Sequence, residues 1–197
     1  MDQWRRASGK ALLVAALRLS TTKPISEVSV AELCREASVT RDTFYRYAGR
    51  PIDVLATALD RDLPELSVSP PASEGGGVRN MDAAIRTFMD HVSRNRAIYR
   101  LASRPHLDSA LRDVLQSRVE ALLAEHARTH PEILPSITGQ QPRPDEVAML
   151  VTFTASGALG AVERWLATDD PVGVDRMIDV ISAASAPWWF LSRGEAS

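Results

Sequence analysis

The stretch that decides the fold is residues 28–47, which read VSVAELCREASVTRDTFYRY. Ser29 is a typical helix N-cap, and Glu32 follows it at the third helical position, which together form a capping box. Val28 precedes the cap and Leu33 follows it, at the two positions of a hydrophobic staple. The pattern predicts a sharply started helix after Ser29.

The same device recurs eleven residues later in the chain. Thr40 is the second N-cap, Thr43 takes the third helical position, and Val39 and Phe44 form the second staple pair. Only residues 37–39 separate the two helices. Two short helices joined by so short a turn predict a helix-turn-helix motif. Its expected inward face comprises Leu33, Cys34, Ala37, Val39 and Phe44.

The second helix of this motif carries side chains that suit nucleic acid. Arginine can donate two hydrogen bonds to guanine or bind phosphate, and Thr and Tyr hydroxyls suit phosphate oxygens or base edges. The alternative interpretation is an ordinary solvated helix face. The paired caps, the turn length and the local charge together favour the nucleic-acid interpretation. The exposed residues are expected to be Arg41, Thr43, Tyr45, Arg46 and Tyr47.

The charge of the chain is unevenly distributed. Overall, 23 Lys and Arg stand against 25 Asp and Glu, for a net charge of −2. Residues 1–50 hold nine of the basic and five of the acidic residues, a net +4, so the remainder carries −6. This asymmetry predicts that only the N-terminal end meets a polyanion.

The composition is that of an ordinary globular protein, with 197 residues of which 45% are hydrophobic. We expect no membrane-spanning run of about 18–20 apolar residues and no signal peptide, and hence a cytoplasmic protein. Cys34 is the single cysteine, which excludes an internal disulfide framework and a cysteine-based zinc site.

Helical periodicity continues through the chain with hardly any two-residue alternation, so the sequence predicts an all-α protein. The Pro/Ser/Gly segment at residues 67–77 is expected to be a loop or linker. Asp170 followed by Pro171 is a typical helix start. A first helix is expected at about residues 4–20. Two short helices and a longer one, which ends near residue 63, follow it. Further helices are expected at about residues 80–95, 107–128, 144–167 and 171–191.

Residues 30–55, VAELCREASVTRDTFYRYAGRPIDVL, resemble the DNA-binding signature of the TetR family of bacterial transcriptional repressors. The resemblance extends over about residues 5–62. It implies a homodimer whose recognition helices enter successive major grooves of a pseudo-palindromic DNA operator. It also implies a C-terminal domain that binds a small-molecule effector and releases DNA when occupied.

The resemblance also implies DNA contacts, position by position. Three residues depart from the family pattern. Ser38 replaces the usual glycine of the turn, and Ala48 replaces the usual large apolar residue. Pro51 occupies the position of a common phosphate-binding lysine, for which the neighbouring Arg50 is a candidate substitute. A left-handed backbone at Ser38 is expected to cost more than at glycine. The expected DNA-binding residues are Ser29, Thr40, Arg41, Thr43, Tyr45, Arg46, Tyr47 and Arg50. Val30, beside Ser29, is expected near the DNA backbone.

The last two helices have the features of a subunit interface. Gly157 and Gly160 each cost a helix interior about 1 kcal/mol relative to Ala, so a packing reason is expected. Two apolar helices at the chain end suit a four-helix interface with a second copy, although an ordinary intrachain core remains the alternative. The expected interface residues are Gly157, Gly160, Ala161, Met177, Ile181, Ala184 and Trp188.

A ligand cavity is expected among the large apolar residues of the C-terminal part, although each residue taken singly is more typical of a core. No charged residue can be named as a ligand anchor, and the ligand cannot be identified from the sequence. The candidate residues are Phe88, Met89, Val92, Tyr99, Leu115, Met149, Phe153 and Trp165.

Catalytic and metal-binding patterns are missing from the sequence. His126 and His130 have a spacing that can hold zinc, but the HExxH context is absent and a surface pair is expected. No nucleophile elbow, phosphate-binding loop or dinucleotide fingerprint occurs. We therefore expect no enzyme, no metal and no cofactor.

The sequence thus predicts three parts: a helix-turn-helix DNA-binding domain at residues 1–50, a connecting helix and loop at 51–79, and a helical ligand-binding and dimerisation domain at 80–197. The expected function is a ligand-responsive, dimeric transcriptional repressor. One alternative is a helical ligand-binding or interaction protein with a vestigial helix-turn-helix, which would bind no DNA in a salt-dependent manner. An α-helical enzyme is disfavoured because no set of nucleophile, base and orienting group can be assembled.

Overall fold

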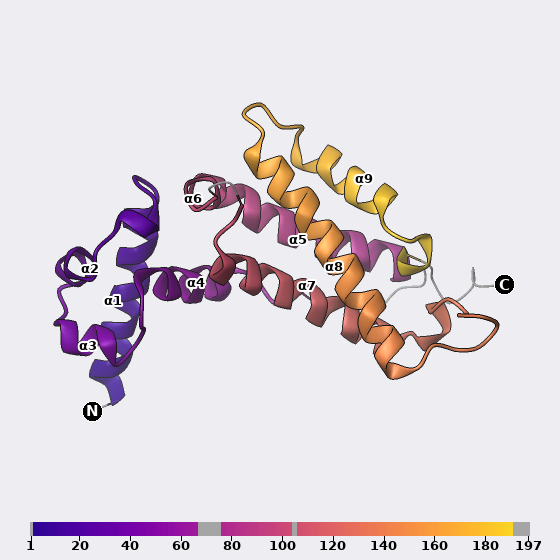
Figure 1. The fold of residues 1–197 in the computed structure, drawn as a ribbon, viewed down its shortest axis with the longest axis horizontal. Helices are drawn as coiled ribbons and strands as arrows, with labels where there is room; N and C mark the ends of the chain where they lie inside the picture. The colour runs from indigo at the N-terminus through magenta and orange to yellow at the C-terminus, as the bar shows by residue number, and fades with distance from the viewer. Residues whose placement is uncertain (1, 67–75, 104–105, 191–197) are drawn as a thin grey trace. The chain divides into compact units, whose positions relative to one another are not determined.

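The computed structural model describes residues 2–66, 76–103 and 106–190, with side chains from residue 7 and, after the first gap, from residue 81 (Figure 1). Within these ranges the chain forms α-helices and short 3-10 helices, and no β-strand beyond two isolated bridges. The predicted all-α fold is confirmed. The chain divides into two compact units, residues 1–63 with 95–114, and residues 64–94 with 115–197.

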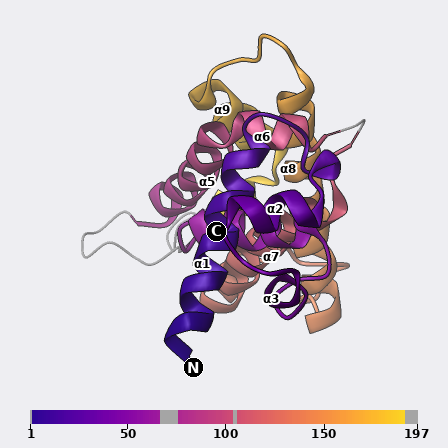
Figure 2. The same ribbon diagram turned by 90° about the vertical axis from the view of Figure 1, so that its left-hand side faces the viewer.

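The first unit is built on α1 (Asp2–Ser20), which packs against α2 (Val30–Glu36), α4 (Pro51–Asp62) and α6 (Arg96–Leu101). The 3-10 helix η1 (Ile25–Glu27) and α3 (Arg41–Tyr45) complete it. Figure 2 shows α2 beside α1, and α3 packs against α2. Its fully buried core side chains include Leu12, Ala16, Leu33, Phe44, Val54, Leu55 and Leu59.

Both predicted helix starts of the first unit are confirmed. The Ser29 Oγ accepts a hydrogen bond from the Glu32 N–H at 3.2 Å, and the Thr40 Oγ1 accepts one from the Thr43 N–H at 3.2 Å. Each cap satisfies a backbone N–H that has no partner inside its helix, which fixes where the helix begins. Of the staple residues, Val28, Leu33 and Phe44 are buried.

The helix α6 is absent from the sequence-based expectation. It spans six residues, too few for apolar periodicity to stand out, and buries Ile98 and Tyr99. The Asn95 side chain, at its N-cap, donates to the Asp62 carboxylate at 3.1 Å. This bond connects the start of α6 to the end of α4 within the first unit.

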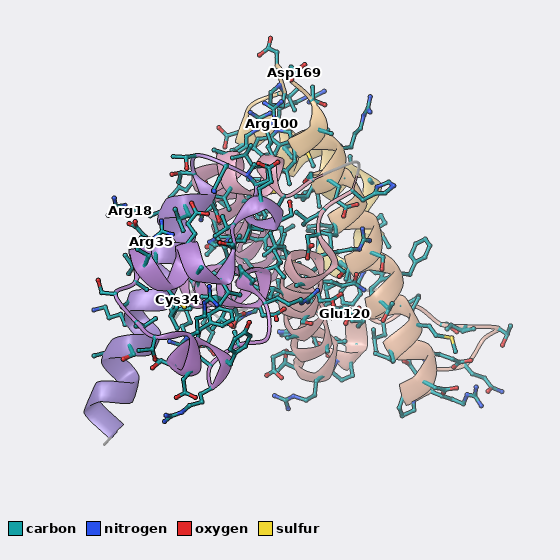
Figure 3. All side chains as sticks on the ribbon, turned by 60° about the vertical axis from the view of Figure 1, so that its left-hand side comes forward. Arg18, Cys34, Arg35, Arg100, Glu120 and Asp169 are labelled. Atoms are coloured by element: carbon teal, nitrogen blue, oxygen red, sulfur yellow. The ribbon has the colours of Figure 1, made fainter. Side chains whose placement is uncertain are left out.

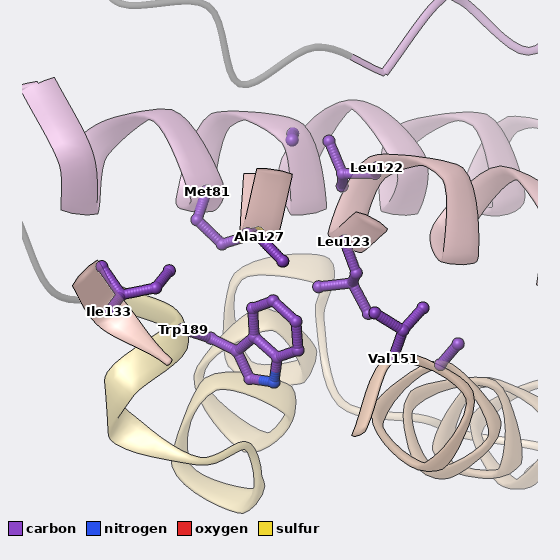
Figure 4. Close-up of a cluster of buried hydrophobic side chains, with 9 residues drawn as sticks. Met81, Leu122, Leu123, Ala127, Ile133, Val151 and Trp189 are labelled. Carbon is purple, nitrogen blue, oxygen red and sulfur yellow. The ribbon is translucent and has the colours of Figure 1, made fainter. Parts of the chain in front are cut away.

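The second unit contains α5 (Gly76–Arg94), residues 115–129 of α7 (Ser109–Thr129), α8 (Pro144–Ala167) and α9 (Val174–Ala184). The short helices η2 (Pro131–Ile133) and η3 (Pro187–Phe190) also belong to it. Packing joins α5 to α9 and η3, and α8 to α9. A cluster of buried apolar side chains in this unit, drawn in Figure 4, comprises Met81, Ala84, Leu122, Leu123, Ala127, Ile133, Val151, Ala155 and Trp189.

The predicted start of the last helix is wrong. The helix α9 begins at Val174 with Gly173 as N-cap, so Asp170 and Pro171 lie in the preceding loop. The Trp165 Nε1 donates to the Val172 carbonyl oxygen at 2.8 Å, which holds this loop against α8 instead. The helix ends at Ala184, because Pro187 has no N–H to donate and disfavours helical backbone in the residue before it.

The start of α5 also differs from the expectation. Residues 67–75 of the expected linker lie outside the described residues, but Gly76 and Gly77 already belong to α5. Residues 76–80 contain one apolar side chain, that of Val78, so the periodicity gave no sign of this first turn.

The helix α8 carries an unusual amount of exposed apolar surface. Among the described residues it is the one helix long and apolar enough to cross a membrane by length and composition, with a mean hydropathy of 1.2 over 18 residues. This corrects the expectation that no apolar run approaches that length. Only 22% of this window is buried within the chain. A core helix of a globular protein is mostly buried, and α8 differs from such a helix in this respect.

Candidate nucleic-acid interface

The turn between α2 and α3 has the hydrogen bonds of a Schellman motif. The Ser38 N–H donates to the Arg35 carbonyl oxygen at 3.2 Å, and the Val39 N–H to that of Cys34 at 2.9 Å. Ser38 adopts a φ of 53°, in the left-handed region that favours glycine. The structure thus places Ser38 in the left-handed backbone that the sequence led us to consider, where a non-glycine residue is expected to cost about 1–2 kcal/mol.

This turn presents α3 with its apolar side inward and its polar side outward. Phe44 is fully buried, whereas the adjacent Tyr45 is 62% exposed. The two rings meet edge to face, with centroids 5.3 Å apart. Arg41 of α3 and Arg46, the C-cap residue of this helix, are exposed. Thr43 is half-buried, with its hydroxyl 3.0 Å from that of Thr40. The arrangement offers an arginine and a tyrosine to a large polar ligand.

The positive charge of the first unit is partly neutralised by acidic neighbours. Four salt bridges join Arg18 to Glu36 at 3.0 Å, Lys23 to Glu32 at 2.8 Å, Arg46 to Asp42 at 3.5 Å and Arg50 to Asp53 at 2.7 Å. Within residues 7–50, the basic side chains that form no salt bridge with described residues are Lys10, Arg35 and Arg41. Arg41 is the one of these three that lies on α3, so its guanidinium is available to a phosphate or a guanine.

Arg50 is held at the start of α4. Its backbone N–H donates to the Asp53 Oδ2 at 2.9 Å, and its guanidinium donates to Oδ1 at 2.7 Å. The hydrogen bond to Asp53 raises the pKa of Arg50, and the negative charge of Asp53 adds to this effect. Pro51 occupies the first helical position, where no N–H partner is needed. Any phosphate that binds Arg50 would therefore meet a guanidinium that is exposed but already bonded to the Asp53 carboxylate.

Tyr47 has a structural contact that the sequence did not reveal. It is 39% exposed, and its ring lies against the buried Gly9 of α1. A Cβ atom added to Gly9 would lie 2.5 Å from the Tyr47 Cε2 atom and 2.9 Å from the phenolic oxygen, closer than real side chains approach. Gly9 thus makes room for this tyrosine, which lies two residues after the end of α3. A glycine within a helix was the available signal for this contact.

Cys34 is buried inside the first unit, as predicted, whereas Arg18 and Arg35 lie on the surface of the same unit (Figure 3). The Cys34 Sγ is 3.8 Å from the Thr40 carbonyl oxygen, so the thiol packs beneath the N-cap of α3. Burial raises the pKa of the Cys34 thiol. A buried thiol with a raised pKa is a packing residue rather than a reactive one.

In the second unit, an apolar cavity of about 50 Å³ lies among α5, α7, α8, α9 and η3. Phe88 is the one predicted ligand-binding residue that lines it. Met89, Val92, Leu115 and Trp165 are buried outside its lining, and Tyr99 is buried in the first unit. Burial raises the pKa of Tyr99.

Two other predicted ligand-binding residues are exposed instead of buried. Met149 is 65% exposed and Phe153 is 81% exposed on α8. The cavity residues missed from the sequence include Trp189 and Phe190, which reach it from η3. Their position depends on where the end of the chain folds back, which periodicity does not reveal.

Six of the seven predicted interface residues line or flank an open face of α8 and α9. Gly157 and Gly160 are exposed, and a Cβ atom added to either would meet nothing within 4 Å. A groove of about 310 Å³ between α8 and α9 is lined by Gly157, Ala161, Ala184 and Trp188, among others. Ile181 is largely buried but still lines this groove, whereas Met177 is buried within its own unit and lies outside the lining.

The expected surface pair of histidines is wrong for His126. This residue is buried, because Trp189 packs against it and the His126 Nε2 lies 3.2 Å from the Trp189 carbonyl oxygen. The His130 ring lies 5.1 Å away and pairs with Glu132. Among the described residues, no group of three or more His, Cys, Asp or Glu side chains is placed to hold a metal ion.

The chain resembles known proteins both in sequence and in fold. Residues 12–49 match the sequence profile described as "Bacterial regulatory proteins, tetR family". No curated protein matches the chain.

Two solved structures share the fold over most of the chain. One is "Dihydroxyacetone kinase operon activator DhaS", with a TM-score of 0.58, 13% identity, and coverage of 90% of this chain and 96% of that one. The other is a tetR-family transcriptional regulator from Streptomyces coelicolor, with a TM-score of 0.59, 17% identity, and coverage of 89% and 78%. The profile match covers α2 and α3, the two helices that form the interface described above.

Proposed function

We propose that this chain, a transcriptional regulator of the TetR family, acts as a homodimeric, ligand-responsive repressor that binds a pseudo-palindromic operator. The observation that carries the proposal is the face of α3. Tyr45 projects into solvent beside the buried Phe44, and Arg41 forms no salt bridge with any described residue. In a helix-turn-helix, the second helix enters the major groove with such residues toward the base edges.

The DNA-binding set that we propose contains residues of two kinds. Arg41, Tyr45 and Arg46 have exposed polar ends, and Arg46 would exchange its 3.5 Å salt bridge with Asp42 for a phosphate. Ser29 and Thr40 already cap their helices, so they would approach the DNA backbone as part of a fixed frame. Tyr47, Thr43 and Arg50 complete the set. Residues 1–50 would form the DNA-reading part.

A second copy of the chain is the occupant that we propose for the open face of α8 and α9. Phe153, Met149 and Val180 are exposed apolar side chains on these helices. Gly157 and Gly160 leave space for close approach of another helix. A two-fold dimer buries the same patch on both subunits, so a self-complementary apolar face suits it. The dimer would place two recognition helices about 34–36 Å apart, one turn of DNA.

The direct test is fluorescence anisotropy with the DNA upstream of the chain's own gene. We expect binding that weakens as salt rises, and Arg41→Ala to cost about 1–3 kcal/mol of binding free energy, roughly 5- to 150-fold in affinity. The matched control is Arg61→Ala, which removes another exposed arginine of the same unit that forms no salt bridge with described residues. Equal affinity for this DNA and a random duplex would refute the proposal.

The direction of regulation is a separate question, because one structure of the same fold bears the name of an activator. A reporter gene behind the upstream DNA distinguishes the two directions. We expect lower expression when the chain is present. Expression that rises instead would replace repression with activation and leave the DNA-binding proposal standing.

One observation favours a second function, a helical ligand-binding or interaction protein with a vestigial helix-turn-helix. Lys23, Arg46 and Arg50 each face a carboxylate of their own unit, which reduces the charge offered to DNA. This alternative predicts dimerisation without salt-dependent DNA binding. The anisotropy experiment decides between the two.

A further inference from the structure

The helix α1 has an apolar side that its own unit leaves uncovered. Residues 11–17 read ALLVAAL, so an unbroken apolar run covers every side of this helix over about two turns. A helix that is apolar on all sides is normally buried. Leu12, Leu13 and Ala16 are buried, but Val14 is 54% exposed. The core of the first unit therefore uses only part of the apolar surface of α1.

The uncovered side of α1 forms one wall of a shallow groove. The groove has a volume of about 410 Å³ and lies between α1 and the end of α2. Ala7, Ala11 and Val14 line it from α1, and Ala37, the C-cap residue of α2, lines it from the other side. Small side chains allow two helices to approach closely. The floor of the groove is therefore apolar and accessible to another helix.

The lining residues of α1 follow the spacing of a helix-binding groove. Ala7, Ala11, Val14 and Arg18 are separated by three or four positions, so they lie on one face of α1. From position 7 to position 18 the helix rises about 16 Å, or about three turns. An amphipathic helix that binds in a groove presents apolar residues at the same spacing over a similar length. The dimensions of the groove thus suit a short amphipathic helix.

The charged groups at the groove are mainly basic. Lys10 lines the groove and is exposed, and Arg35 is exposed next to Glu36 on α2. Neither basic side chain forms a salt bridge within the part of the chain that the structure describes. Arg18 pairs with Glu36 at 3.0 Å, so the acidic residue of the lining is already neutralised. A partner with carboxylates beside its apolar face would therefore gain favourable charge contacts.

The charge and the floor of the groove argue against two other occupants. A two-fold contact between copies of this chain buries the same patch on both, so Lys10 and Arg35 of one copy would meet the basic groups of the other. Like charges that face each other across an interface oppose association. A DNA backbone binds through hydrogen-bond donors, and the side chains of Ala11 and Val14 offer none. An acidic amphipathic helix satisfies both the apolar floor and the basic rim.

The groove lies on the side of α1 that is turned away from Tyr47. Gly9 is the residue of α1 that meets the Tyr47 ring. Successive residues of a helix are rotated by about 100°, so Val14 and Ala11 lie about 140° and 200° around α1 from Gly9. A helix bound in the groove would therefore leave Tyr47, a member of the proposed DNA-binding set, uncovered.

We infer that the groove between α1 and the end of α2 binds an acidic amphipathic helix of another protein. The apolar face of that helix covers Ala7, Ala11 and Val14, and its flanking carboxylates meet Lys10 and Arg18. The inference goes beyond the proposed function, because it gives the first unit a protein partner in addition to DNA.

Binding is tested on the full chain with a fluorescein-labelled synthetic peptide. The peptide has about 16 residues, with leucines at helical spacing and glutamates at the flanking positions. Its control has the same composition in an order that places the leucines on no common face. Fluorescence anisotropy is expected to show saturable binding of the first peptide and at least about tenfold weaker binding of the control. Equal binding of the two peptides, or binding of neither, overturns the inference.

Matched substitutions locate the binding site. Val14→Asp places a carboxylate on the floor of the groove and is expected to weaken peptide binding at least about tenfold. Val172→Asp changes another exposed valine, in the loop before α9, and is expected to leave the affinity unchanged. Lys10→Glu reverses a charge at the groove and is expected to weaken binding about fivefold, whereas Arg61→Glu on α4 is its unaffected control. Unchanged affinity in Val14→Asp or in Lys10→Glu overturns the inference.

The substituted positions are exposed, so we expect all four variants to fold. The comparison of the two peptides on the natural chain remains decisive even where a variant loses stability.

Added duplex DNA distinguishes a protein-binding groove from a further nucleic-acid surface. A random duplex is expected to change the affinity for the acidic peptide by less than about twofold at ~0.15 M salt, where charges more than about 8 Å apart are largely screened. A duplex that displaces the peptide would make the groove a nucleic-acid surface and overturn the inference. Failure of the chain to bind its upstream DNA would contradict the proposed function and leave the peptide result unaffected.

Discussion

Phe44 of the first unit and Phe153 of the second are the same residue type in opposite environments. Phe44 is fully buried beneath α3, whereas Phe153 is 81% exposed on α8. A buried phenylalanine stabilises its own fold, and an exposed one within a wider apolar face marks a place where another molecule binds. The proposed DNA-binding face of α3 thus consists of polar groups above a buried aromatic ring. The proposed dimer face of α8 and α9 consists of apolar groups that their own chain leaves exposed.

The largest expected effect concerns the buried member of this pair. Phe44→Ala removes the base of α3 and is expected to lower the free energy of unfolding by about 3–5 kcal/mol. Phe153→Ala, measured on the monomer at low concentration, is its control and is expected to change that free energy by less than about 0.5 kcal/mol. Urea unfolding of both variants measures the difference. Similar losses in the two would show that Phe153 has an intrachain role.

The exposed member is tested by subunit association. Phe153→Glu places a charge on the proposed interface and is expected to weaken the dimer by about 2 kcal/mol or more. Val14→Glu changes an exposed apolar residue of α1, which lies outside that face, and should leave the dimer unaffected. Analytical ultracentrifugation compares the two. A dimer that tolerates Phe153→Glu would have its interface elsewhere.

A smaller effect is expected at the turn between α2 and α3. Ser38 has a φ of 53°, so Ser38→Gly removes the cost of a left-handed residue and is expected to raise stability by about 1 kcal/mol. Ser38→Ala keeps that cost and serves as the control. Thermal unfolding distinguishes them. Equal melting temperatures for the two variants would indicate that this turn carries no strain.

The smallest effect that we expect is a pH dependence from His126. Burial lowers the pKa of His126 below its ordinary value of 6.5, and the nearby His130 adds to this shift. The unfolded chain therefore takes up a proton before the folded chain does, so His126 destabilises the fold as pH falls below 6.5. Above pH 6.5 the stabilising contribution of His126 to the fold is fully present.

The measurement is urea unfolding between pH 7.5 and 5, comparing the natural chain with His126→Gln. The variant is expected to lose less stability on acidification, whereas the exposed His106→Gln is expected to follow the natural chain. An identical pH profile in His126→Gln would show that another group is responsible.

The two units also differ in how far their structure could be foreseen. The caps at Ser29 and Thr40 act within three residues, so the sequence predicted them and the helix-turn-helix with them. The burial of His126 and the cavity wall at Thr154 depend on Trp189, which is 63 and 35 residues away along the chain. Apolar periodicity identifies helices, but it does not say whether an apolar side chain meets its own core, a cavity or a second copy.

The contact between Gly9 and Tyr47 has a consequence for sequence divergence. The ring of Tyr47 occupies the space that any side chain at position 9 would need. A lineage that acquires a larger residue at position 9 must therefore shrink or lose the aromatic ring at position 47, and a lineage that keeps the ring must keep the glycine. In chains descended from a common ancestor with this one, we expect the two positions to change together, so that their paired substitution records how each descendant holds α3 against α1.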